Sequence, residues 1–151
     1  MCFGCSTHNA ASLGLRFYYD QEHDEAVSFF SASSAHSSFP GVVHGGIISV
    51  LADEVAYWAL QLQAKRPALT TRLDVRYLRP ARVGSTLEVR AKAKPAEAKQ
   101  ATVAVRVLDE KQQVCAQATV TYALVAQAAM KAVLGPVVET YSRWAQETTP
   151  Q

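Results

Sequence analysis

The chain has 151 residues, of which 49% are hydrophobic and 19% charged, and its formal net charge at pH 7 is +2. This length suits a single domain with its own hydrophobic core, and no charged or low-complexity run indicates disorder. The small net charge excludes a broad basic surface for nucleic acid. No run of about 18 apolar residues predicts a membrane span, and the first residues lack the pattern of a signal peptide, so we expect a cytoplasmic protein.

Three cysteines form an odd number, which favours reduced thiols over a disulfide framework. Cys2 and Cys5, together with His8, offer three metal ligands, but a structural zinc site needs four. We therefore expect a reduced terminal loop without metal, and no redox role, because no βαβ pattern surrounds the cysteine pair. The candidates for a fourth ligand are His23, His36 and Cys115.

The first third of the chain predicts two strands and a loop. Apolar and polar residues alternate over Leu13–Asp20, as in a half-buried strand, and a shorter strand is expected over Ala26–Ser31. Residues 31–40 are rich in Ser and end at Phe39-Pro40-Gly41, which is typical of a loop.

Residues 46–63 form the best predicted helix, because the segment has no internal Pro or Gly and an apolar stripe at helical spacing. The opposite face mixes small, apolar and polar side chains. We expect it to meet a partner subunit or a ligand, because a helix that is apolar on most sides is buried on most sides. The core stripe comprises Ile47, Leu51, Val55, Trp58 and Leu62, and the second face comprises Gly46, Ser49, Val50, Asp53, Tyr57 and Leu60.

After Pro67 the hydrophobic period changes to two, and four strands are expected over residues 70–79, 87–93, 101–107 and 114–124. In the first of these strands the alternation puts one set of residues on one face, namely Thr71, Leu73, Val75 and Tyr77, and the other set on the opposite face, namely Thr70, Arg72, Asp74 and Arg76. Short turns separate the four strands and leave no room for crossover helices, so the sheet should be antiparallel. This order of elements predicts an α+β fold in which an antiparallel sheet of about six strands wraps around one long central helix, the hotdog arrangement.

The domain is expected to span residues 1–125. Residues 126–151 should form a partly helical C-terminal extension that packs on the same domain, interrupted at Gly135-Pro136, with Tyr141 and Trp144 available to dock.

The sequence His44-Gly45-Gly46 leads directly into the predicted helix. A helix N-terminus presents unpaired N–H groups, and glycine lets a ligand oxygen approach them closely, so this segment can serve as an oxyanion hole. Alternatively, the glycines only make a tight turn and His44 satisfies a buried polar group.

Asp53 follows Gly46 by seven residues, close to two helical turns, so both project from the same face. A carboxylate beside an oxyanion hole can act on an acyl carbonyl as general base or nucleophile. The alternatives are an exposed Asp, a salt bridge across a subunit interface, or Glu54 as the active acid.

Four arginines, on or just after the first long strand, can bind the phosphate groups of a substrate such as a coenzyme A ester, although for any single one of them a solvated strand face is the stronger explanation. Thr70 and Thr71 can position water or a thioester oxygen. The arginines are Arg72, Arg76, Arg79 and Arg82.

Three segments in register resemble the phenylacetyl-CoA thioesterase-like branch of the hotdog family, relatives of the 4-hydroxybenzoyl-CoA thioesterases. The resemblance covers most of the chain through Leu124. The segments are Cys2-Phe3-Gly4-Cys5 with residues 13–17, Gly41–Gly46 with residues 51–54, and Thr70–Pro80.

The resemblance implies a homodimer whose sheets join edge to edge, which can pair into a tetramer, with active sites at the subunit interface. It implies that the Gly46 N–H polarises the thioester carbonyl and that Asp53 activates water or attacks directly. Thr70 would supply a hydroxyl from the partner subunit, and His44 would orient the loop or contact substrate.

The chain departs from the family at Ser38, where relatives can carry an amide, and after Cys5, where they commonly carry Asn-Pro. The expected substrate-binding residues are Ser38, Val43, Gly45, Tyr57, Thr71, Arg79 and Arg82.

We therefore expect an enzyme that hydrolyses an acyl-CoA thioester to a free acid and coenzyme A, with no cofactor apart from the coenzyme A of the substrate. One alternative is a non-catalytic acyl-CoA-binding domain, which would have no use for a buried carboxylate at Asp53. The other is a hydratase or dehydratase, whose pattern the spacing of His44 and Asp53 fits less well.

Overall fold

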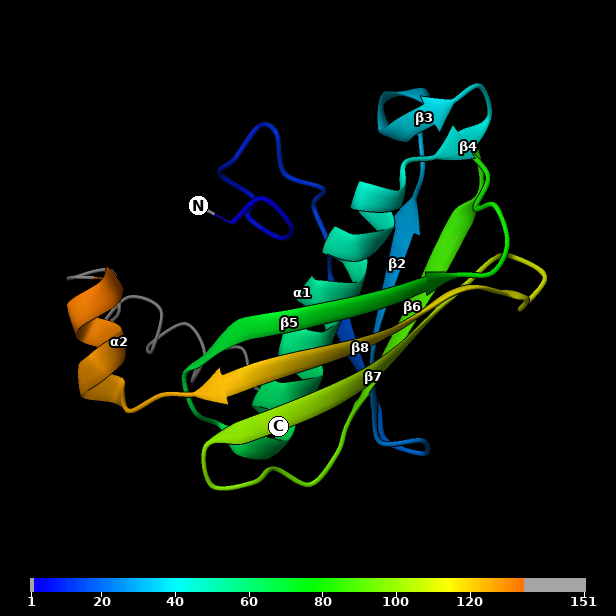
Figure 1. Ribbon diagram of the computed structural model, residues 1–151. Helices are drawn as coiled ribbons and strands as arrows, with labels where there is room; N and C mark the ends of the chain where they lie inside the picture. The colour runs from blue at the N-terminus through cyan, green and yellow to red at the C-terminus, as the bar shows by residue number, and fades with distance from the viewer. Residues whose placement is uncertain (1, 135–151) are drawn as a thin grey trace.

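Alternating hydrophobicity produces the expected strands in the computed structural model, which describes residues 2–134. Six strands form one antiparallel sheet in the order β1-β2-β6-β7-β8-β5, so β1 and β5 are its edges. The sheet wraps around one long helix, α1, as the hotdog prediction required (Figure 1). The six strands are β1 (Phe17–Asp20), β2 (Glu25–Ser31), β5 (Ala68–Tyr77), β6 (Thr86–Ala93), β7 (Gln100–Leu108) and β8 (Val114–Leu124).

The core lies between the sheet and α1. Every second residue of the central strands points toward the helix, and these side chains are almost completely buried. They pack on Leu51 and Val55 of α1, which are 0% exposed. Their partners from the sheet include Leu87, Val89, Val103, Val105, Val120 and Tyr122.

The helix α1 spans Gly45–Ala64 and ends at Lys65 in the left-handed conformation. The buried face of α1 is rotated relative to the predicted core stripe. Leu60, which was expected on the second face, is fully buried, and four other buried residues also lie outside the stripe. Small alanines on this face let the sheet approach the helix closely. The predicted core residues Ile47, Trp58 and Leu62 are only half-buried, and Trp58 stacks on Phe17 of β1. The four additional buried positions are Ile48, Ala52, Ala56 and Ala59.

The predicted first strand was four residues too long, because β1 begins only at Phe17. The preceding residues pair with the N-terminal loop: the N–H groups of Leu13 and Leu15 donate to the carbonyls of Phe3 and Gly4 at 2.8 and 3.0 Å. Residues 13–15 therefore pair with the N-terminal loop, and the pairing with β2 begins only at Phe17.

The predicted loop over residues 31–40 contains short regular elements instead. A 3-10 turn, η1 (Ser34–His36), leads into a small hairpin of β3 (Ser37–Phe39) and β4 (Val42–Val43). Gly41 turns the hairpin at φ +77°, a conformation that favours glycine. This hairpin lies beside the N-terminal end of α1 (Figure 1).

The described part of the C-terminal extension is the helix α2 (Gln127–Leu134), in which Met130 is buried. The predicted break at Gly135-Pro136 and the docking residues Tyr141 and Trp144 lie outside the described residues. Within residues 2–134, no helix is long and apolar enough to cross a lipid bilayer.

Candidate active site

His44 caps the N-terminus of α1. Its Nδ1 accepts a hydrogen bond from the Gly46 N–H at 2.8 Å, and its carbonyl accepts from the N–H groups of Ile47 and Ile48. A ring nitrogen that accepts carries no proton, so this cap uses the tautomer protonated at Nε2. The Gly46 N–H, to which the resemblance gives the oxyanion, is therefore already hydrogen-bonded to the His44 ring.

Gly45 presents the other N–H of this turn, and we find no partner for it among residues 2–134. Its carbonyl accepts from the hydroxyls of Tyr77 at 3.0 Å and Ser49 at 3.1 Å, and those two hydroxyls are 2.9 Å apart. Tyr77 at the end of β5 thus ties the helix start to the edge strand. Sequence reasoning missed this role, although Tyr77 shares the predicted face of Leu73 and Val75.

Asp53 lies two turns along α1 and is half-buried. Its Oδ1 accepts a hydrogen bond from the Thr70 hydroxyl at 2.9 Å, and its carbonyl accepts from the Tyr122 hydroxyl at 3.1 Å. The resemblance implied that Thr70 would come from a partner subunit. In the structure the pair forms within one chain.

A β-bulge on β5 places Thr70 beside Asp53. Thr70 pairs with Tyr122, and Arg72 pairs with Thr121, so Thr71 is the extra residue. Directly opposed residues share a sheet face, so Thr70 faces the helix, as the fully buried Tyr122 does. The predicted alternation put Thr70 on the opposite face from Leu73 and was wrong, because a bulge shifts the period by one.

Thr71 is consequently turned away from Asp53, and its hydroxyl donates to the Thr121 carbonyl at 3.1 Å. Tyr122 also contacts Tyr57 of α1, with ring centroids 6.2 Å apart. Burial, and secondly the nearby Asp53 carboxylate, raise the pKa of Tyr122, which keeps its hydroxyl protonated as a donor.

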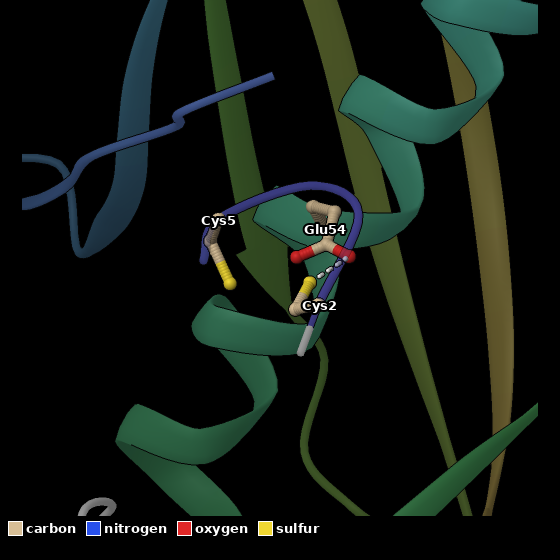
Figure 2. A group of neighbouring side chains, drawn as sticks. All are labelled: Cys2, Cys5 and Glu54. Atoms are coloured by element: carbon tan, nitrogen blue, oxygen red, sulfur yellow. Dashed lines mark hydrogen bonds between the residues drawn. The ribbon is translucent and has the colours of Figure 1, made fainter. Parts of the chain in front are cut away.

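Glu54 projects about 100° around the helix from Asp53. It contacts the N-terminal loop, where the Cys2 thiol donates to its Oε1 at 3.1 Å (Figure 2). Burial is the main cause that raises the pKa of Glu54. Glu54 is thus engaged on a different side of α1 from the Thr70–Asp53 pair.

The remaining predicted binding residues lie outside these two groups of contacts. Val43 is buried in β4, and Ser38 is exposed on β3. The Arg79 guanidinium donates to the Val114 carbonyl at 3.0 Å, and Arg82 is exposed where it bridges to β4.

Comparisons with known proteins agree with this architecture. A model of the Thioesterase superfamily matches residues 40–116, which include both the His44-Gly45-Gly46 turn and the Thr70–Asp53 pair. No curated protein matches the chain.

Solved structures of similar fold include the phenylacetic acid degradation protein PaaI from Thermus thermophilus, in a mutant form. It is 28% identical with a TM-score of 0.66, and the match covers 75% of this chain and 95% of that one. PaaI from E. coli is 19% identical, with a TM-score of 0.68 and coverage of 78% and 83%. A hypothetical thioesterase from Streptococcus pneumoniae, solved with coenzyme A, is 15% identical, with a TM-score of 0.64 and coverage of 68% and 79%. Because the family model matches more than half of the chain, the protein belongs to the thioesterase superfamily.

Proposed function

We propose that the protein hydrolyses an acyl-CoA thioester to a free acid and coenzyme A, with Asp53 as general base or nucleophile. The observation that carries this proposal is the Thr70–Asp53 hydrogen bond of 2.9 Å, which a β-bulge creates on the half-buried face of α1. Bulges are frequent next to active sites because they redirect a side chain. Membership of the thioesterase superfamily supports the reaction class.

In this reaction an oxygen nucleophile attacks the thioester carbonyl carbon and the C–S bond breaks. If Asp53 acts as general base, it takes the proton of the attacking water and the coenzyme A thiolate leaves and is then protonated. If Asp53 attacks directly, water hydrolyses the resulting anhydride in a second step. In both cases the Thr70 hydroxyl holds the carboxylate in position.

The developing oxyanion is assigned to the Gly45-Gly46 turn, at the positive end of the helix dipole. The Gly46 N–H becomes available only when the His44 ring turns away, whereas the Gly45 N–H is available as it stands. Gly45→Pro removes that N–H at the first helical position, which generally accepts Pro, and His44 already has the extended conformation that precedes Pro. A Cβ atom here lies 3.3 Å from the Tyr77 ring, so Gly45→Ala, which adds the Cβ and keeps the N–H, is the matched control. We expect the Pro variant to lose activity. If it keeps the parent rate, the donor is Gly46.

We further propose that each site is shared between two chains. Gly45 and Gly46 precede Asp53 by eight and seven residues, so either N–H is about 10–12 Å from Asp53 along the helix axis. A reacting carbonyl must lie about 3 Å from both the donor and the nucleophile, and one short Asp side chain does not span this gap. Two antiparallel helices related by a twofold axis would place the glycine turn of one chain opposite Asp53 of the other, twice per dimer.

The edge strand β5 supports such a homodimer. Three large hydrophobic residues on or just after it are 40%, 55% and 44% exposed, and an uncovered apolar edge strand invites association. Two such dimers would form the tetramer that the resemblance implies. The three residues are Leu69, Tyr77 and Leu78.

The catalytic assignment is tested by thiol release from a panel of aromatic and medium-chain acyl-CoAs. Asp53→Asn should lower kcat by about 10²-fold or more, as expected for removal of an acid–base group. Asp24→Asn is the matched control, because Asp24 is exposed in the turn between β1 and β2, not on the edge strand β5, and Asn accepts its positive φ. An Asp53→Asn variant that retains parent rates on every substrate would exclude the assignment.

A complementation experiment tests the shared site. Equal amounts of Asp53→Asn and Gly45→Pro chains, each inactive alone, are unfolded and refolded together. The heterodimer then has one site with both groups intact and should regain activity. If heterodimers form but stay inactive, the two groups act within one chain.

A further inference from the structure

Two thiols and one carboxylate converge on the side of α1 that faces the N-terminal loop (Figure 2). The sulfur atoms of Cys2 and Cys5 and a carboxylate oxygen of Glu54 all lie within 4.8 Å of one another, and all three residues are half-buried. Within residues 2–134, no other group of three such side chains converges in this way. The proposed hydrolysis uses none of them.

The loop is shaped around the Glu54 carboxyl group. A Cβ atom at Gly4 would overlap that carboxyl group, so any larger residue there would displace the Glu54 side chain from its place beside the two cysteines. The loop is also fixed on its other side, because the Phe3 and Gly4 carbonyls accept from Leu13 and Leu15. The backbone therefore holds the two cysteines against the helix.

A backbone donor already points at one of the two sulfur atoms. The Gly4 N–H points at Cys2 Sγ, 3.2 Å away. A neutral thiol sulfur is a weak acceptor, whereas a thiolate bound to a metal ion would accept this hydrogen bond more strongly. Outer hydrogen bonds of this kind orient the ligands of metal sites.

We propose that Cys2, Cys5 and Glu54 bind one zinc ion, with water as the fourth ligand. Thiolates and carboxylates are both zinc ligands, and soft thiolates disfavour Mg²⁺ and Ca²⁺. Two ligands at about 2.3 Å from a tetrahedral ion lie about 3.8 Å apart, so side-chain movements on the order of 1 Å bring the three atoms around one ion. The cation also offsets the cost of gathering three anionic groups in a half-buried place.

The donor set differs from the one that the cysteine spacing suggested. His8 is exposed, His23 pairs with Asp20 at 2.9 Å, and His36 contacts Ser33. The Cys115 thiol lies on β8 against the Gln113 carbonyl. Glu54 of α1 takes the place that the sequence gave to a histidine.

Zinc at this position would link the N-terminal loop to the middle of α1. Loss of the ion should therefore release the loop. Glu54 is the residue next to Asp53, but it projects about 100° away, so the ion is not in contact with the reacting atoms of the proposed hydrolysis. Three protein ligands and a water leave the ion one exchangeable position.

The test measures zinc in the full chain, purified under reducing conditions without a histidine tag. We expect about one zinc per chain by mass spectrometry, and affinity lowered about tenfold or more in Cys5→Ser and in Glu54→Gln. His8→Ala is the control and should bind zinc as the parent does. In cobalt-substituted parent protein, sulfur-to-metal charge-transfer absorption should appear, and Cys2→Ser and Cys5→Ser should each weaken it.

Any of three results would overturn the proposal. The first is a parent protein with three free thiols that binds no zinc at micromolar concentration. The second is a parent with one free thiol and no zinc, which shows that two of the three cysteines form a disulfide, and the third is a His8→Ala variant that loses zinc as Cys5→Ser does. The parent stoichiometry and the cobalt spectrum do not depend on the folding of any variant, and neither readout depends on hydrolysis.

Discussion

Replacement of Thr70 by Val tests whether the bulge on β5 serves the reaction. The substitution keeps the shape of the side chain and removes only the hydroxyl that donates to Asp53 Oδ1 at 2.9 Å. A hydrogen bond to a charged group contributes about 1.5–3 kcal/mol, and about 1.4 kcal/mol corresponds to a factor of ten in rate. If the hydroxyl positions the carboxylate in the transition state, kcat should fall about 10- to 100-fold, with kcat/KM falling equally.

Thr71→Val is the matched control for this experiment. Thr71 is the next residue on the same strand, but its hydroxyl donates to the Thr121 carbonyl and not to Asp53. We expect its rate in the thiol-release assay to stay within about threefold of the parent. Thr70→Ser should recover most of the loss, since it restores the donor. Equal rates for Thr70→Val and Thr71→Val, with the same elution in size-exclusion chromatography, would refute a positioning role for Thr70.

The remaining predictions concern stability. Leu51→Ala should lower the free energy of unfolding by about 2–5 kcal/mol in urea titration, because Leu51 is 0% exposed between α1 and the sheet; a loss below about 1 kcal/mol would contradict this packing. Asp20→Asn tests acid stability: the Arg90 guanidinium, 2.8 Å away, lowers the pKa of Asp20 to about 2. The native pKa is below the unfolded value of about 3.9, so the carboxylate stabilises the protein above about pH 4, and this contribution is lost as the pH falls toward 2. The difference in unfolding free energy between parent and Asp20→Asn should therefore shrink over that range; a constant difference would exclude the linkage.

Local periodicity was sufficient to predict the main elements. The alternation over residues 114–124 defines β8 to the residue, and the helix prediction is one residue short at each end. Both segments have an uninterrupted pattern and lie against the core, so pattern and burial coincide. The prediction was weaker where a segment pairs with something other than its neighbour, as Leu13 and Leu15 do with the N-terminal loop.

The candidate site was predictable in its residues but not in its contacts. Asp53 and Thr70 were both chosen from the sequence, yet the alternation of β5 placed Thr70 on the wrong face. A bulge adds a single residue, which hydrophobic period alone does not reveal when the neighbours are Thr and Arg. The register that creates it comes from pairing with β8, about 50 residues later, where Thr70 meets Tyr122.

Asp53 and Glu54 are consecutive carboxylates that point to different sides of α1, because a helix turns about 100° per residue. Asp53 faces Thr70 and the proposed subunit interface, whereas Glu54 faces the two thiols of the loop. The charge of Asp53 still contributes, after burial, to the raised pKa of Glu54, so the two groups are close enough to influence each other. If they nevertheless act as separate sites, Asp53→Asn should lose hydrolysis and keep its zinc. An Asp53→Asn protein that lost both would mean that the two carboxylates form one functional unit, and the division of α1 into a reacting side and a metal-binding side would be wrong.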